Sequence, residues 1–229
     1  MNNIYRNSLS RIKAGDWIAL AAFLVALFSV GWQVKDAWVG ADVHMLDMSN
    51  RPVEIRCHSK IKDTCWGSIE NPDDSTGRFT VVLPVFFYND GAVNYNAVVE
   101  RLTAEVSYSG LSQPVELVAN QFWQLVQGGG GKDSRPFVPI VIEGKRGNGA
   151  EIRFAPFDDS NFVNWRDLAL DISEDRINEF DIQVNAYFVG EQKPRTQSCK
   201  FEINERLREK LKSRIQRRST QVRLTLTCR

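Results

Sequence analysis

The stretch FTVVLPVFFYNDG, residues 79–91, decides the fold class. Residues 79–88 are apolar on both faces of an extended chain, and β-branched and aromatic side chains dominate them. This pattern predicts a strand that is covered from both sides. Asn89-Asp90-Gly91 is a turn signal, and residues 98–108 alternate between apolar and polar, so the two segments predict a hairpin.

Further alternating runs lie on both sides of this unit, separated by segments rich in turn formers. They cover residues 53–57, 115–126, 137–142, 152–154, 168–172, 182–189, 199–203 and 222–228. Many short strands, with one convincing helix after the N-terminal region, favour an antiparallel sandwich over a parallel α/β sheet.

The segment FFYNDG, residues 86–91, followed by a long alternating strand, also resembles the opening of bacterial membrane-tethered immunoglobulin-like domains. We therefore expect a mainly β fold. It comprises an N-terminal single transmembrane helix, an antiparallel immunoglobulin-like β-sandwich and one basic C-terminal helix.

The transmembrane prediction depends on residues 17–34, WIALAAFLVALFSVGWQV, which carry no charge. A helix of this length measures about 27 Å, close to the hydrocarbon thickness of a bilayer. Trp17 near one edge, and Trp32 and Trp38 near the other, are expected to anchor it in the headgroup layers. A cleaved signal peptide is the main alternative, but this apolar stretch is longer than a usual signal sequence. A buried soluble helix would normally show a polar stripe.

The flanking charges predict the orientation of that helix. Arg6, Arg11 and Lys13 precede it, and only Lys35 and Arg51 follow it closely, so the N-terminus should be cytoplasmic. We expect a single-pass protein of the cell membrane whose C-terminal domain is periplasmic or extracellular. Its parts are a basic tail (1–16), a transmembrane helix (17–39), an extended linker (40–77) and a β-sandwich (78–229), which strand 52–57 is expected to join.

The four cysteines favour disulfides over a metal site. They occur as Cys57 with Cys65 and Cys199 with Cys228, not at the CxxC-like spacing that groups metal ligands. Cys199 and Cys228 share the parity of the apolar residues in their strands and so point at the core. Buried free thiols are the alternative for this pair. Both bonds would require an oxidising compartment.

Residues 204–218, NERLREKLKSRIQRR, predict an amphipathic helix capped by Asn204. Seven basic residues form its candidate contact face: Arg206, Arg208, Lys210, Lys212, Arg214, Arg217 and Arg218. Such a face could bind an anionic partner, and the alternative is a solvated helix whose long side chains cover apolar edges.

Catalytic motifs are weak in this sequence. The tetraglycine at residues 128–131 and Lys132 fail the GxxxxGK[ST] phosphate-loop pattern, because Val126 and Asp133 occupy deciding places. The two histidines, His44 and His58, lie in the linker, and no serine stands in a GxSxG motif. We therefore predict no enzyme activity, no catalytic residue, no metal and no cofactor.

These observations predict a membrane-anchored, non-enzymatic binding or scaffolding module, an accessory subunit of a larger envelope assembly. Its partners would be membrane lipid and another membrane or envelope protein. With a net charge of +1, we do not expect nucleic acid, and no small-molecule ligand is indicated. One alternative is a cytoplasm-facing domain whose basic helix binds nucleic acid or acidic lipid, and a second is a periplasmic hydrolase.

Overall fold

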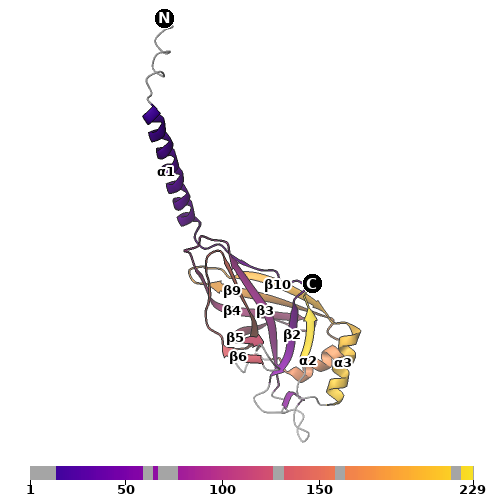
Figure 1. Ribbon diagram of the computed structural model, residues 1–229. Helices are drawn as coiled ribbons and strands as arrows, with labels where there is room; N and C mark the ends of the chain where they lie inside the picture. The colour runs from indigo at the N-terminus through magenta and orange to yellow at the C-terminus, as the bar shows by residue number, and fades with distance from the viewer. Residues whose placement is uncertain are drawn as a thin grey trace.

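One curled antiparallel sheet forms most of the molecule (Figure 1). The computed structural model describes residues 14–58, 64–66, 77–125, 132–157, 163–217 and 223–228. The strands are β1 (Val43–Met45), β2 (Pro52–His58), β3 (Arg78–Asn89), β4 (Ala97–Tyr108), β5 (Val115–Leu125), β6 (Lys132–Pro136), β7 (Ile140–Ile142), β8 (Arg146–Pro156), β9 (Glu179–Phe188), β10 (Arg195–Glu202) and β11 (Arg223–Thr227). The helical segments are α1 (Ala14–Val39), η2 (Thr64–Trp66), α2 (Trp165–Ser173) and α3 (Glu205–Gln216).

The hydrogen-bonded strand order is β10-β9-β4-β5-β8-β3-β2-β11, with β1 on β3, β6 on β5 and β7 on β4. Although β10 and β11 stand at opposite ends of this order, Cys199 and Cys228 join them with 5.4 Å between their Cα atoms. The sheet therefore curls until its two edges meet, and the core lies inside the curl. A mainly β, antiparallel fold is confirmed. The immunoglobulin-like sandwich is not, because the described strands hydrogen-bond in one continuous sheet.

The linker predicted for residues 40–77 contains two strands of this sheet. β2 lies between β3 and β11, and β1 pairs with the end of β3. Pro84 lies on β3 between the segment paired with β2, which ends at Val82, and the segment paired with β1, which begins at Phe87. On its other side Pro84 is paired with Glu151 of β8, so a missing backbone N–H is tolerated only where it faces the gap between β2 and β1.

The predicted hairpin between residues 79–88 and 98–108 is wrong. β3 pairs with β8, β2 and β1, whereas β4 pairs with β9, β5 and β7. The connection at Asn89-Asp90-Gly91 instead carries the chain from one part of the curled sheet to another.

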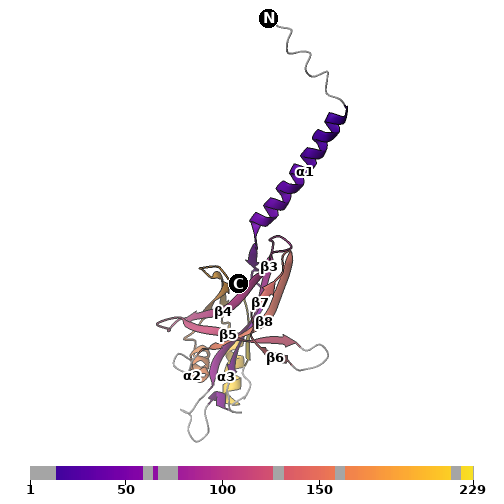
Figure 2. The same cartoon turned by 90° about the vertical axis from the view of Figure 1, so that its left-hand side faces the viewer.

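Residues 168–172, predicted as a strand, lie in the helix α2. Trp165, Leu168, Ala169 and Ile172 follow helical spacing and are buried, and Asn164 caps the helix by accepting from the Arg166 N–H. The predicted helix at 204–218 corresponds to α3, whose Leu207 N–H donates to Asn204 Oδ1 over 3.0 Å. The two helices pack together at the end of the sheet farthest from α1 (Figures 1 and 2).

Helix α1 projects away from the sheet in both views (Figures 1 and 2). Its apolar side chains are exposed, including Phe28 at 72% and Val25 at 66%. Of the residues whose side chains the structure describes, which in α1 are 17–32 and 34, none form a helix long and apolar enough to cross a membrane.

Candidate functional site

Two disulfides hold the β-domain together, as the cysteine spacing predicted. Cys57 at the end of β2 bonds to Cys65 of η2, and Cys199 of β10 bonds to Cys228 just after β11. The second bond is buried, with each residue 2% exposed. A chain crosslinked in this way has fewer conformations in its unfolded state. This loss of conformations is the main source of disulfide stabilisation in the chain-entropy account.

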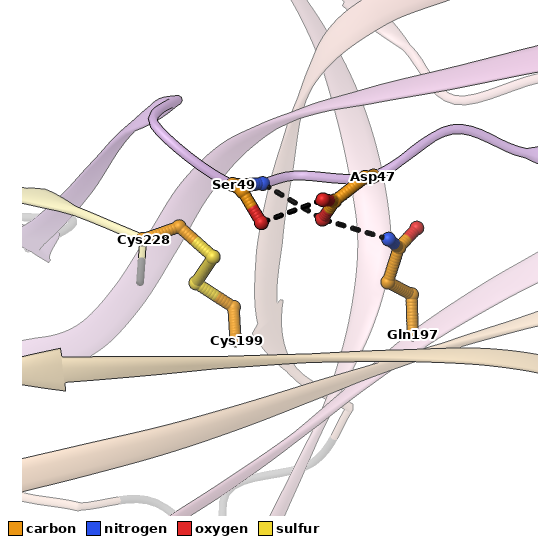
Figure 3. Close-up of a disulfide and its surroundings, with 5 residues drawn as sticks. All are labelled: Asp47, Ser49, Gln197, Cys199 and Cys228. Carbon is orange, nitrogen blue, oxygen red and sulfur yellow. Dashed lines mark hydrogen bonds between the residues drawn. A yellow bond between two sulfur atoms is a disulfide. The ribbon is translucent and has the colours of Figure 1, made fainter.

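The connection between β1 and β2 runs along the seam where β10 and β11 meet, as Figure 3 shows. Asp47 accepts from the Ser49 hydroxyl at 2.6 Å and from the Gln197 amide at 3.2 Å, so the connection is tied to β10. Asn50 N–H donates to the Cys228 carbonyl at 3.0 Å, which ties it to the β11 side. The bonds from Ser49 hold the pKa of Asp47 below its usual value.

The link between α1 and the sheet is short and is hydrogen-bonded to the β-domain. Only residues 40–42 separate Val39, the last residue of α1, from Val43, the first of β1. Asp90 N–H donates to the Asp42 carbonyl at 2.6 Å, and Ala92 N–H donates to the Gly40 carbonyl at 3.3 Å. The link is therefore part of the folded domain and not a free tether.

Asn89 is the centre of this junction. Its side chain is fully buried, and its Oδ1 accepts from the Asp42 and Gly91 N–H groups at 3.1 and 2.9 Å. Its Nδ2 donates to the carbonyls of Tyr95 and Ile142 at 2.8 and 3.1 Å. One side chain thus ties together the link, the β3–β4 loop and β7. A buried amide with its bonds filled rigidifies the backbone that surrounds it.

Two glycines allow the backbones of the junction to approach closely. A Cβ on Gly91 would lie 2.3 Å from the Gly40 carbonyl oxygen, and one on Gly144 would lie 2.0 Å from that of Ala92. Lys145, beside Gly144, donates to the Asp90 carbonyl and to its carboxylate at 2.6 and 2.9 Å. That contact holds the pKa of Asp90 below its usual value.

An open cavity of about 370 Å³ adjoins the junction. The β3–β4 loop and the turn before β8 form it, and it is lined by Val93, Asn94, Asn96, Glu143, Gly144 and Arg146. Arg146 pairs with Glu143 at 2.5 Å. Amide and ionic groups, with one valine, make this cavity mostly polar.

The predicted basic face of α3 needs one correction. Arg208 is 6% exposed, and its guanidinium donates to the carbonyls of Ile203 and Ile177 at 2.9 and 3.3 Å and pairs with Asp175 at 2.8 Å. It fixes the start of α3 to the α2–β9 turn and cannot contact a partner. Its place one turn from the Asn204 cap is the sequence signal for this role.

The other basic residues of the predicted face divide as follows. Arg206, Lys210, Lys212 and Arg217 are exposed, Arg214 is half-buried and Arg218 lies outside the described residues. Leu207, Leu211 and Ile215 face the core. Binding by this face stays a prediction.

The predicted membrane anchors are placed in part. Trp17 and Trp32 lie in α1 and are 59% and 56% exposed, whereas the Trp38 side chain is outside the described residues. Trp165 is fully buried and packs edge-on against Trp66 with ring centres 6.4 Å apart. It is a core residue.

Neither histidine forms part of a described metal cluster. His44 is exposed and lies 3.5 Å from Asp42, and the His58 side chain is outside the described residues. Within the described part of the chain, no group of three or more His, Cys, Asp and Glu side chains could hold a metal ion. The tetraglycine at 128–131 lies outside the described residues.

Comparison with known proteins does not identify a family for this chain. No family model matches the chain, and no curated protein matches it. Among solved structures, a crystal structure of a protein from Archaeoglobus fulgidus is 10% identical, over 71% of this chain and 96% of that chain, with a TM-score of 0.32. A likeness at this TM-score says nothing about function.

Proposed function

We propose that this protein is a membrane-anchored, non-enzymatic binding or scaffolding module, held by α1 and acting as an accessory subunit of an envelope assembly. The observation that carries the proposal is the contrast between the two parts of the molecule. The β-domain buries its large apolar side chains in one core, whereas α1 leaves Trp17, Phe23 and Phe28 at 59%, 60% and 72% exposure. In water such a helix would be unfavourable. Burying one large apolar side chain contributes about 1.5–3 kcal/mol, and the exposed side chains of α1 would forgo this gain.

The disulfides support the proposed side of the membrane. Structural disulfides persist in oxidising compartments and are rare where glutathione and thioredoxin keep thiols reduced. Together with the basic residues that precede α1, they favour a cytoplasmic N-terminus and an external β-domain. They argue against the cytoplasm-facing alternative.

A partner protein is the occupant we propose for the exposed basic face of α3. β9 begins at the end that carries α3 and ends near α1, and its ten residues extend about 33 Å. That length is several times the Debye length of about 8 Å at physiological salt. The headgroups around α1 would therefore attract this face weakly, so an acidic surface of another envelope protein fits it better.

The test is extraction and thiol labelling of the full chain in cells. We expect the protein to stay with membranes in alkaline carbonate, and its cysteines to react with maleimide only after reduction. A Phe23→Asp/Phe28→Asp variant should leave the membrane fraction, and its cysteines should react with maleimide without reduction, because a β-domain that is not exported stays where thiols are kept reduced. Release of the unaltered chain by carbonate would refute the anchor, and reduced cysteines in untreated cells would refute the external location.

A further inference from the structure

We infer that the end of the β-domain joined to α1 rests on the bilayer, with Val93 and Val189 in contact with phospholipid. This inference depends on the proposed membrane anchor, and it adds a surface and a partner to it. The surface, called the α1-proximal face below, consists of residues 40–42, 90–96, 143–146 and 189–191.

The short link between α1 and β1 keeps the loops beside it close to the end of α1. Three residues of extended chain span about 10 Å at most, and those between α1 and β1 are hydrogen-bonded to the β3–β4 loop. If α1 lies in the bilayer up to its end, the β3–β4 loop, which is bonded to the link, cannot move away from the membrane surface. The junction around Asn89 then fixes how the domain sits on the membrane.

The loops of this face expose apolar side chains. Val93 lies two residues after Gly91 and is 70% exposed, and Tyr95 in the same loop is 38% exposed. Val189 follows β9, donates its N–H to the Val98 carbonyl at 3.0 Å and is 62% exposed. Valines at loop tips, with a tyrosine beside them, suit the boundary between headgroups and acyl chains.

Charge pairing indicates what kind of membrane is contacted. Lys145 pairs with Asp90, Arg146 with Glu143, and Arg195 with Glu191. The face therefore carries no cluster of unpaired cations of the kind that selects acidic lipid. We expect contact with neutral and acidic bilayers alike, and the cavity lined by Val93 is the place where a headgroup would enter.

The experiment is photocrosslinking of the full chain in phosphatidylcholine nanodiscs, with benzoylphenylalanine at one position at a time. Position 93 tests the face and position 189 repeats the test from another loop. Position 23 in α1 is the positive control. Position 157 is the matched negative control, because Phe157 is 86% exposed but follows the opposite end of β8 from Arg146.

The inference predicts lipid adducts at positions 23, 93 and 189 and none at 157, with the same result when phosphatidylglycerol is added. Lipid adducts at 23 without adducts at 93 and 189 would overturn the inference and leave the anchor standing. Absence of adducts at 23 would overturn the anchor itself. Protein adducts at 93 would show that this face is a protein interface.

Discussion

Replacing Asn89 by alanine tests whether one buried amide holds α1 to the β-domain. The change removes four hydrogen bonds, and those to Gly91 N–H and the Ile142 carbonyl are buried. Leaving a buried donor or acceptor unsatisfied costs about 1–3 kcal/mol. Water can reach the groups of Asp42 and Tyr95, whose bonds are only partly buried, so they add little. We expect Asn89→Ala to lower the free energy of unfolding by about 2–4 kcal/mol.

Asn148→Ala is the matched control, because Asn148 donates one exposed side-chain bond, to the Val141 carbonyl at 3.0 Å. It should cost about 0.5 kcal/mol. Urea unfolding of the detergent-solubilised full chain gives both values, and hydrogen exchange reports on the junction directly. Exchange at the Asp42 and Gly91 amides should accelerate in Asn89→Ala alone. Equal stability and equal exchange in the two variants would refute the reading of Asn89 as the centre of the junction.

Three further results are expected. Replacing both Cys199 and Cys228 by alanine should lower the free energy of unfolding by about 3–4 kcal/mol, from the 29-residue separation that the bond closes, as read from urea midpoints under non-reducing conditions. Arg208→Met should lower the free energy of unfolding by about 2–4 kcal/mol, because it leaves two buried carbonyls without a donor. The exposed Arg206→Met should lower it by under about 0.5 kcal/mol. Equal losses would contradict the assignment of Arg208 as a buried donor. Burial, then the charges of nearby carboxylates, raises the pKa of Tyr108 to about 12, so its stabilising contribution is complete below pH 10 and is lost as the pH rises to 12. Ultraviolet titration, with Tyr108→Phe as the reference, measures this pKa.

The longer strands could be read from the sequence because their periodicity is local, whereas β1 and β6 were not predicted. β10 alternates cleanly, since one face of it lines the core and the other meets solvent. The parity of Cys199 within its strand predicted a core-facing sulfur for the same reason. Local alternation does not identify the neighbouring strand, however, so the β3–β4 hairpin was predicted wrongly. The Cys199–Cys228 pair was predicted, but not that it joins the two ends of one curled sheet.

The junction was missed because its parts are far apart in the sequence. Asn89-Asp90-Gly91 has the composition of a hairpin turn, yet the Asn89 amide reaches Asp42 and Ile142. α2 was missed for a different reason. A short apolar run such as residues 168–172 fits both the strand period and the helix period. The spacing from Trp165 to Ile172 favours a helix only when Asn164 is recognised as its N-cap. Arg208 shows the limit of charge counting, since a basic residue on a helix can be a buried donor.

The closed sheet also constrains the order in which the chain can fold. β2 pairs with β3 soon after both are made, but its other partner, β11, follows it by about 170 residues. At a synthesis rate of about 5–20 residues per second, one side of β2 stays unpaired for roughly 10–30 s. Throughout that interval the nascent domain presents an open strand edge to its surroundings, so its yield should depend on how long that edge waits for β11.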